Sequence, residues 1–188
     1  MNLMFCPLFS SLAPEKPKSY PFSMESKIFG RNMADIPICG DLDLKIGQDG
    51  TWFYKNSPIT RQKLVKLFAG ALCRDADGVF WLITPIERCR VMVEDAPFLA
   101  VEMRKEGEGS RAALDFRTNI GEWIELGPDH SLQMRKGIPY VKMDKNLEAK
   151  INRPLYYDLV DLAEKVGQGF FLWSRGKQFS LGTLHETK

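Results

Sequence analysis

The 188-residue chain has little histidine, no long apolar run and no surplus of charge of one sign. Only two histidines are present, His130 and His185, and the four cysteines form no CxxC pair, so we expect no metal and no cofactor. No apolar stretch approaches the roughly 20 residues that a membrane-spanning helix needs, which argues against a membrane partner. The 26 basic and 24 acidic residues give a net charge of +2, too small a surplus to predict nucleic-acid binding.

The cysteines Cys6, Cys39, Cys73 and Cys89 are widely spaced in the sequence. Scattered cysteines in a domain of this size indicate reduced thiols and therefore a cytoplasmic protein. Cys73 and Cys89 lie in apolar patterns, which favours core positions over catalytic nucleophiles.

The first 33 residues differ in composition from the rest of the chain. Four of the eleven prolines fall here, among serines and lysines and without sustained periodicity. We predict a disordered tail over residues 1–33 and a short second tail over residues 183–188. Met24 and Met33 are alternative start codons, and the sequence leaves that choice open.

Between the tails, one order of predicted elements occurs twice. In the first copy, "DLDLKI" and "TWFYK" flank a Gly/Asp turn and predict a hairpin. A helix follows, with Asn56 or Ser57 as its cap and Pro58 in its first turn. Apolar residues recur along this helix at helical spacing, at Leu64, Leu67, Phe68, Ala71 and Leu72. A Gly/Asp break then leads to the strand "VFWLIT".

The second copy repeats this order with shorter loops. "PYVKM" and "LEAKI" predict a hairpin, "NRPL" begins a helix, and "GQG" precedes the strand "FFLWS". The apolar face of this helix consists of Leu155, Leu159, Leu162, Ala163 and Val166. We infer an internal duplication with a first unit over residues 34–105 and a second over residues 106–182. The predicted fold class is α+β, mostly antiparallel β structure with two main helices.

Long blocks of this sequence carry a family resemblance. They are "IPICGDLDLKIGQDGTWFYKNSPITR", "DGVFWLITPIERCRVMVEDAPFLAVE", "LDFRTN", "PYVKM" and "LWSRG", and they span about residues 36–182. Together they resemble a bacterial family catalogued only as domain of unknown function 1285. The resemblance implies two similar β-rich units, the second loosely like a pleckstrin-homology fold. It also carries the suggestions of a nucleotide-type ligand between the units and of a role in signalling.

Charged residues line one face of the predicted strand at 88–94. A solvated face explains them, and ion pairs within the fold are the alternative for any single arginine. The planar fork of arginine also suits phosphate or carboxylate, and a helix N-terminus adds N–H donors. We therefore predict an anion site in the groove between the units, formed by Arg61, Glu87, Arg88, Arg90, Arg117, Thr118 and Asn119.

Three other motifs have ordinary structural interpretations. "GEGSRA" matches a dinucleotide fingerprint, but an alternating strand pattern follows it, so we expect a hairpin tip. His130 and Ser131 are sequence neighbours without a third partner, which favours a turn over a catalytic pair. The aspartates Asp41, Asp43 and Asp49 suit turn chemistry better than acid–base chemistry or metal binding.

These observations favour a cytoplasmic, non-catalytic binding or regulatory protein. It would hold a small anionic, nucleotide-like ligand between the two units. The alternative is an adaptor that binds a protein partner and no small ligand. A third hypothesis, a hydrolase using the carboxylates, has the weakest basis because no nucleophile–base or metal constellation is present.

Overall fold

The structure is a computed structural model that describes residues 27–28, 31–32, 35–39 and 42–183. These residues include two α-helices, α1 (Gln62–Ala71) and α2 (Arg153–Asp161). The strands form two six-stranded sheets, one three-stranded sheet and one two-stranded sheet. The architecture is α+β with mostly antiparallel pairing, as the sequence predicts.

The first six-stranded sheet has the strand order β5-β4-β3-β8-β7-β6. Its strands are β3 (Leu44–Ile46), β4 (Trp52–Tyr54), β5 (Ser57–Pro58), β6 (Leu72–Arg74), β7 (Phe80–Ile83) and β8 (Arg88–Val93). Two antiparallel three-stranded arms meet at its centre, where β3 and β8 pair in parallel. We call this sheet and α1 the first unit.

The second six-stranded sheet has the order β11-β10-β9-β14-β13-β12, again with one parallel pair, β9 with β14, at its centre. Its strands are β9 (Phe98–Glu106), β10 (Ala113–Thr118), β11 (Trp123–Glu125), β12 (Leu132–Arg135), β13 (Ile138–Lys142) and β14 (Glu148–Ile151). Single 3-10 turns, η2 (Gly109–Arg111) and η3 (Asp144–Asn146), follow β9 and β13. The "GEGSRA" motif is thus a hairpin tip, as expected.

The strands after α2 form a sheet of their own, β15 (Glu164–Val166), β16 (Gly169–Ser174) and β17 (Lys177–Thr183). In the first unit the strands after α1 complete the main sheet, whereas here β9 pairs with β14 instead. The duplicated order of elements is therefore present, but the strand pairing differs between the copies. The sheets change between β8 and β9, so β9 belongs to the second sheet although the first unit was expected to extend to residue 105.

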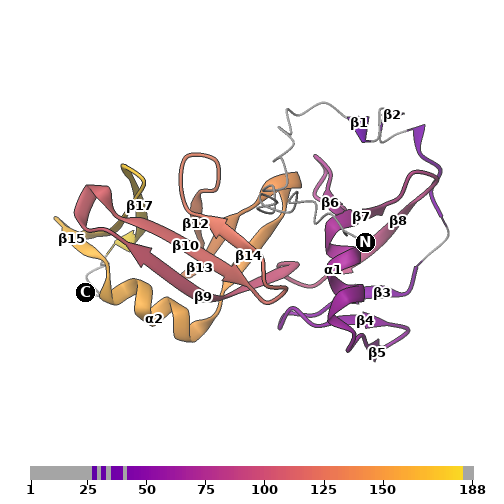
Figure 1. The fold of residues 1–188 in the computed structure, drawn as a ribbon, viewed down its shortest axis with the longest axis horizontal. Coiled ribbons are helices and arrows are strands. Elements are labelled where there is room, and N and C mark those ends of the chain that lie inside the picture. Colours follow the sequence, from indigo (N-terminus) through magenta and orange to yellow (C-terminus); the bar gives the residue numbers. More distant parts are fainter. Residues whose placement is uncertain (1–26, 29–30, 33–34, 40–41, 184–188) are drawn as a thin grey trace, which may run out of the picture.

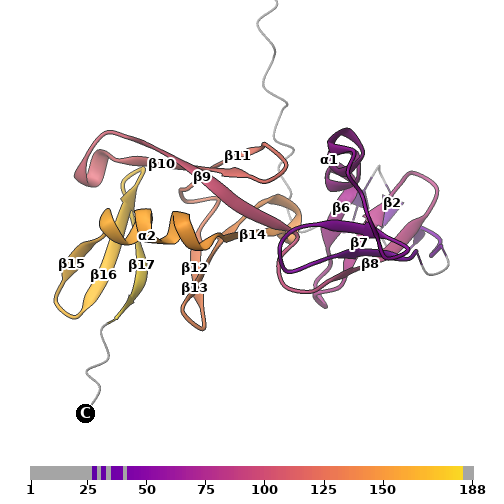
Figure 2. The same cartoon turned by 90° about the horizontal axis from the view of Figure 1, so that it is seen from below.

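Figure 1 shows the first unit at one end of the long axis of the molecule and the second unit at the other. The second unit comprises β9 to β17 and α2. Figure 2 shows α2 running alongside β9, with β15, β16 and β17 at the end farthest from α1. Arg175, at the β16–β17 turn, ties this small sheet to the large one through hydrogen bonds to the carbonyls of Leu114 and Leu126, both 3.0 Å long.

The two Asn-x-Pro sequences behave differently. Asn152 caps α2, its side chain accepting from the amide of Leu155 at 3.0 Å, and a proline occupies the first turn, as predicted. The prediction for Asn56 and Pro58 is wrong, because α1 begins later, at Gln62, and has no side-chain cap. Lys55 and Asn56 both have positive φ, 47° and 62°, and form the two-residue turn between β4 and β5. That backbone suits a tight hairpin and leaves Asn56 outside the helix.

The apolar face of α1 also differs from the prediction. Val65 and Ala69 are buried, whereas Leu67 is 68% exposed. Phe68 packs partly against the core and stacks on Trp52, with ring centroids 6.2 Å apart. On α2, the predicted core residues Leu155 and Leu159 are buried. The larger of the two apolar clusters among the described residues continues through both units, and the smaller consists of Ile36, Cys73 and Ile83.

Two predictions about the chain ends and cysteines need correction. Part of the tail expected to be disordered forms the antiparallel pair β1 (Lys27–Ile28) and β2 (Arg31–Asn32), and the rest of residues 1–33 lies outside the described residues, as does Cys6. Cys39 and Cys89 were expected as reduced thiols but form a disulfide across 50 residues. Strand pairing brings them together, which sequence spacing does not reveal.

No helix among the described residues has the length and apolar character needed to cross a membrane.

Candidate functional site

A pocket of about 220 Å³ opens where the C-terminal end of α1 meets the second unit. We call it the inter-unit pocket. Its walls are formed by Ala69, Gly70, Phe98, Glu122, Trp123, Ile124, His130, Met143, Asp144, Lys145 and Leu147. The first two residues belong to α1 and the others to the second unit, so the pocket depends on how the units pack.

Lys145 links the two units beside this pocket. Its Nζ donates a hydrogen bond of 2.5 Å to the carbonyl of Gly70, in the last turn of α1. Carbonyls in the last turn of a helix lack intrahelical donors, and the negative end of the helix dipole favours a cation there. The neighbouring Asn146 side chain adds a contact of 3.4 Å to the carbonyl of Arg74.

A histidine and two acidic residues supply the other polar groups of the pocket. His130 Nε2 lies 3.5 Å from Asp144 Oδ1, and His130 Nδ1 lies 3.3 Å from the carbonyl oxygen of Glu125. A protonated imidazole can donate to both acceptors, whereas a neutral ring can donate to only one. Glu122 is also among the residues that line the pocket.

Two cations from different units converge next to the pocket, at the turn between β10 and β11. A Cβ atom at Gly121 would lie 3.4 Å from Lys66 Nζ and 3.9 Å from Arg117 Nη2. Lys66 belongs to α1 and Arg117 to β10, so packing of the units creates this positive pair. Gly121 has a φ of 85°, a backbone conformation that glycine adopts readily.

An aromatic ring completes the site. Trp123 on β11 lines the pocket, and 42% of its surface is exposed. The Arg104 guanidinium lies 4.9 Å from its ring centroid, within the range of a cation–π contact. Arg104 thus covers part of the ring, and the exposed remainder offers a planar ligand an aromatic surface.

Asp115 holds the strand that carries Arg117 in place. It is buried and contacts two arginines, Arg104 Nη2 at 2.6 Å and Arg175 Nη2 at 2.5 Å. Burial alone would raise the pKa of this carboxyl, but the hydrogen bonds from Arg104 and Arg175 outweigh it, and the pKa lies below its ordinary value. Asp115 is therefore an ionised structural residue rather than a proton donor.

Three of the predicted anion-site residues lie together at the end of β10. Arg117 pairs with exposed Glu102, at 2.9 Å. Thr118 is buried, and its hydroxyl accepts from the amide of Glu122 and donates to its carbonyl, which fixes the β10–β11 turn. Asn119 accepts from the amide of Leu99 and donates to the Gly50 carbonyl, so it joins the units. None of the three is among the described lining residues of the pocket, but Arg117 adjoins it.

The other four predicted residues lie elsewhere. Arg61 is exposed at the N-terminal end of α1, the opposite end from the pocket. Arg90 is exposed on β8, and Arg88 lies over the ring of Trp81, 4.7 Å from its centroid. Glu87 adjoins the disulfide between Cys39 and Cys89. A role for these four in ligand binding stays a prediction, but the structure does not bring them to the inter-unit pocket.

The predicted site residues did not include Lys66, Trp123, Asp144 or Lys145. The pocket lies between segments far apart in the sequence, so no local motif marks it. His130 drew attention, but as a turn residue beside Ser131 rather than as a partner of Asp144.

Profiles of known protein families match most of the chain. A profile described as "Domain of unknown function (DUF1285), N-terminal domain" matches residues 35–96, and the corresponding C-terminal profile matches residues 97–181. The search of curated proteins finds no match. Neither these profiles nor the solved structures support the expected likeness to a pleckstrin-homology fold, which stays a prediction.

Two solved structures are similar to this chain. A DUF1285 family protein from Silicibacter pomeroyi DSS-3 is 38% identical, with a TM-score of 0.74 over 80% of this chain and 85% of that chain. A DUF1285 family protein from Shewanella baltica OS155 is 30% identical, with a TM-score of 0.54 over 64% of this chain and 91% of that chain. From residue 35 to residue 181, the chain therefore consists of the two domains of the DUF1285 family, and it belongs to that family.

Proposed function

We propose that the protein is a non-catalytic, regulatory binding protein of the cytoplasm that holds a small anionic, nucleotide-like ligand in the inter-unit pocket. The observation that carries this proposal is the approach of Lys66 and Arg117 to one turn beside the pocket. Lys66 and Arg117 come from different units, and because Arg117 already pairs with exposed Glu102 at 2.9 Å, an anionic group there would bind Lys66 and compete with Glu102 for Arg117. Ligand binding would then be coupled to the packing of the units.

The size of the pocket limits the ligand. Sites for drug-sized ligands occupy roughly 300–1,000 Å³, and this pocket has about 220 Å³. A mononucleotide that leaves its phosphate at the rim suits this volume better than a dinucleotide does. Trp123 would stack the base, Lys66 and Arg117 would contact the phosphate, and the carboxylates of Glu122 and Asp144 would accept from hydroxyl or amino groups.

Thermal-shift titration of the full chain tests this proposal. The ligands are purine and pyrimidine nucleoside monophosphates, with the free nucleosides and inorganic phosphate as separate arms. We expect a concentration-dependent increase in melting temperature with at least one monophosphate and a smaller one with its nucleoside. Lys66→Ala should reduce the increase, and Lys63→Ala, also exposed but one turn farther from the pocket end of the same helix, should not.

The adaptor alternative has one specific observation in its favour. Tyr157 and Val160, both on α2, are 56% and 40% exposed and leave an apolar strip on the surface of the second unit. If all mononucleotides and phosphate leave the melting temperature unchanged at millimolar concentration, the ligand proposal fails and the adaptor becomes the leading hypothesis.

A further inference from the structure

The segment 36–39 runs beside Arg88, the first residue of β8. The Arg88 amide donates to the Pro37 carbonyl, and the Cys39 amide donates to the Arg88 carbonyl, both at 2.9 Å. Ile38 and Arg88 form a parallel bridge. The next residues along each strand, Cys39 and Cys89, are therefore neighbours, with their Cα atoms 5.2 Å apart.

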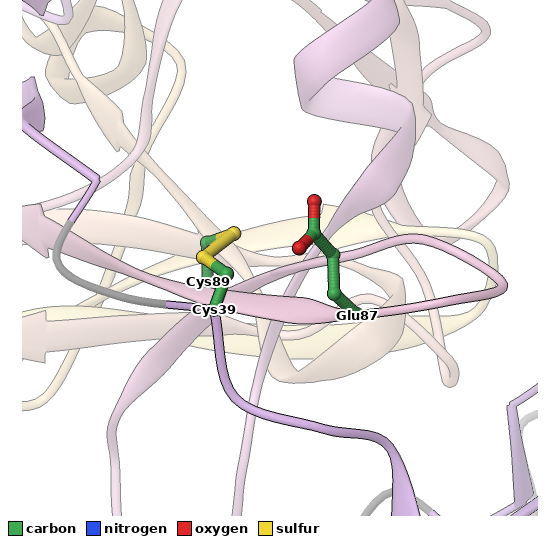
Figure 3. A group of neighbouring side chains, drawn as sticks. All are labelled: Cys39, Glu87 and Cys89. Atoms are coloured by element: carbon green, nitrogen blue, oxygen red, sulfur yellow. A yellow bond between two sulfur atoms is a disulfide. The ribbon is translucent and has the colours of Figure 1, made fainter.

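Glu87 joins this pair because of the two-residue period of a strand. Glu87 and Cys89 are separated by one residue, so their side chains point to the same face of β8. Figure 3 shows the Glu87 carboxylate and the sulfurs of Cys39 and Cys89 on the same side of the strand. One sulfur from each cysteine and one carboxylate oxygen all lie within 4.8 Å of one another.

We propose that Cys39, Glu87 and Cys89 form a redox-controlled binding site for a thiophilic divalent cation such as Zn²⁺. In the oxidised protein the disulfide occupies the two sulfur ligands. In the reduced protein two thiolates and the carboxylate hold the cation, and water takes the fourth position of a tetrahedral shell. This site is separate from the inter-unit pocket, and its assignment does not depend on the proposed ligand.

The chemistry of the switch balances with a dithiol as the reductant. The dithiol transfers two electrons and two protons to the Cys39–Cys89 bond and becomes a cyclic disulfide, leaving two thiols. Binding of Zn²⁺ then releases both thiol protons to solvent, because only thiolates are strong ligands. Oxidation by a second disulfide would remove two electrons from the thiolates, reform the bond and release the cation.

The distances suit a zinc centre. Zn–S bonds of about 2.3 Å and Zn–O bonds of about 2.0–2.2 Å place the ligand atoms of a tetrahedral site about 3.3–3.8 Å apart. In the oxidised protein the two sulfurs are bonded to each other and the carboxylate oxygen lies within 4.8 Å of both, so reduction must first release the sulfurs before side-chain rotation gives those separations. Glu87 is exposed and Cys39 half-buried, which gives the cation access from solvent, whereas Cys89 is buried.

The remaining described cysteine is suited to be an internal control. Cys73 is buried, and burial raises the pKa of its thiol to about 11. It therefore stays protonated near neutral pH and competes poorly for metal. Cys6 lies outside the described residues, so a Cys6→Ser background limits the reactive thiols to Cys39 and Cys89.

The disulfide and the bound metal would each fix the same segment, residues 36–39, to the rest of the first unit. The segment 36–39 inserts Ile36, 2% exposed, into a small apolar cluster with Cys73 and Ile83. In the oxidised protein the disulfide links this segment to β8, and in the reduced protein the bound metal does so. The reduced, metal-free protein would lose this link and keep the backbone contacts of the segment and the packing of Ile36.

Cobalt titration tests the site directly. The Cys6→Ser protein is reduced with dithiothreitol, desalted under nitrogen and titrated with Co²⁺, whose thiolate-to-metal charge-transfer absorption in the near ultraviolet reports sulfur ligation. We expect one Co²⁺ per chain, displaced by one equivalent of Zn²⁺, and no such absorption in the oxidised form of the same protein. Glu87→Gln should weaken Co²⁺ binding at least tenfold, and Glu108→Gln, at an exposed position outside the cluster, should not.

The oxidised and reduced forms share one sequence, so the comparison does not depend on whether a cysteine variant folds. The proposal is overturned if the reduced protein shows no thiolate absorption with Co²⁺ or if the oxidised protein binds Co²⁺ equally well. Unchanged affinity in Glu87→Gln would also contradict it, since the carboxylate would then not be a ligand.

Discussion

The side-chain amide of Asn119 donates a hydrogen bond of 3.2 Å to the carbonyl of Gly50 and thereby joins the second unit to the first. The same side chain accepts from the amide of Leu99 at 3.1 Å. Gly50 has a φ of 72°, and a Cβ there would lie 2.8 Å from Asn119 Nδ2 and 3.2 Å from Leu99 Cγ. The absence of a side chain at residue 50 is thus required for this contact between the units.

Gly50→Ala should destabilise the fold by more than its backbone conformation alone explains. Positive φ costs an alanine about 1 kcal/mol, and the close approach to Asn119 adds to it. Gly137→Ala is the matched control, because Gly137 has a φ of 76° and no atom near an added Cβ. Urea unfolding of both variants separates the two contributions, and equal losses would show that the contact between Gly50 and Asn119 is not tight.

Asn119→Ala should lower the free energy of unfolding by about 1–3 kcal/mol, since the Leu99 amide and the Gly50 carbonyl lose their partner. In the double variant with Gly50→Ala, the loss in the free energy of unfolding should be smaller than the sum of the two single losses, because both changes disturb one contact. Strict additivity in urea unfolding would argue that Asn119 does not act through Gly50.

Leu159→Ala and Leu67→Ala should differ sharply. Leu159 is fully buried on α2, and truncation of such a side chain costs about 2–5 kcal/mol. Leu67 is 68% exposed, so its truncation should change the free energy of unfolding by less than about 0.5 kcal/mol. Denaturant unfolding checks the pair, and a large loss in Leu67→Ala would mean that an unseen partner covers α1.

Asp115 should make the protein sensitive to acid. Its pKa in the folded state lies below the ordinary value of 3.8, so its contribution to stability is complete above that value and is lost as the pH falls through the folded-state pKa. Asp115→Asn should lower the free energy of unfolding at neutral pH by about 1–3 kcal/mol, because the buried carboxylate makes charge-assisted hydrogen bonds but both arginines reach solvent. It should also flatten the pH dependence of stability below the ordinary carboxyl pKa. Exposed Asp129→Asn serves as the control, and an unchanged acid slope in Asp115→Asn would contradict this assignment.

Reduction of the Cys39–Cys89 disulfide in metal-free Cys6→Ser protein should lower the free energy of unfolding by about 2–4 kcal/mol, because the bond closes a long loop in the unfolded chain. The two cysteines are 50 residues apart. Parallel urea titrations with and without dithiothreitol measure the change, with Cys39→Ser as the variant that should no longer respond. A response of Cys39→Ser equal to that of the parent would contradict the assignment.

Local sequence signals predicted the elements whose backbone they determine. Asn152 and the following proline begin α2 because a side-chain cap and a missing N–H act within one turn. The same signal at Asn56 failed, because a left-handed conformation at Lys55 and Asn56 forms a hairpin turn first. Leu67 was misjudged since helical spacing shows that a face is apolar but not which part of it meets the sheet.

The candidate site was less accessible to sequence reasoning because it depends on packing. Arg117 was among the predicted residues, but its approach to Lys66 depends on α1 docking beside the β10–β11 turn. The disulfide was missed for the same reason, since a parallel bridge at Ile38 and Arg88 sets the positions of both cysteines. Contacts of this kind between distant segments leave no spacing pattern in a single sequence.

The tryptophan indole signals of the ¹⁵N-labelled protein provide the most direct test of the inter-unit pocket. The chain has four tryptophans, Trp52, Trp81, Trp123 and Trp173, so three of them serve as controls within the same sample. On titration with a purine nucleoside monophosphate, the Trp123 signal should shift in a saturable manner while the other three stay in place. In Lys66→Ala the same shift should require a higher concentration. A saturable shift at another tryptophan with Trp123 unmoved, or no shift at any of them, would contradict the proposed ligand site.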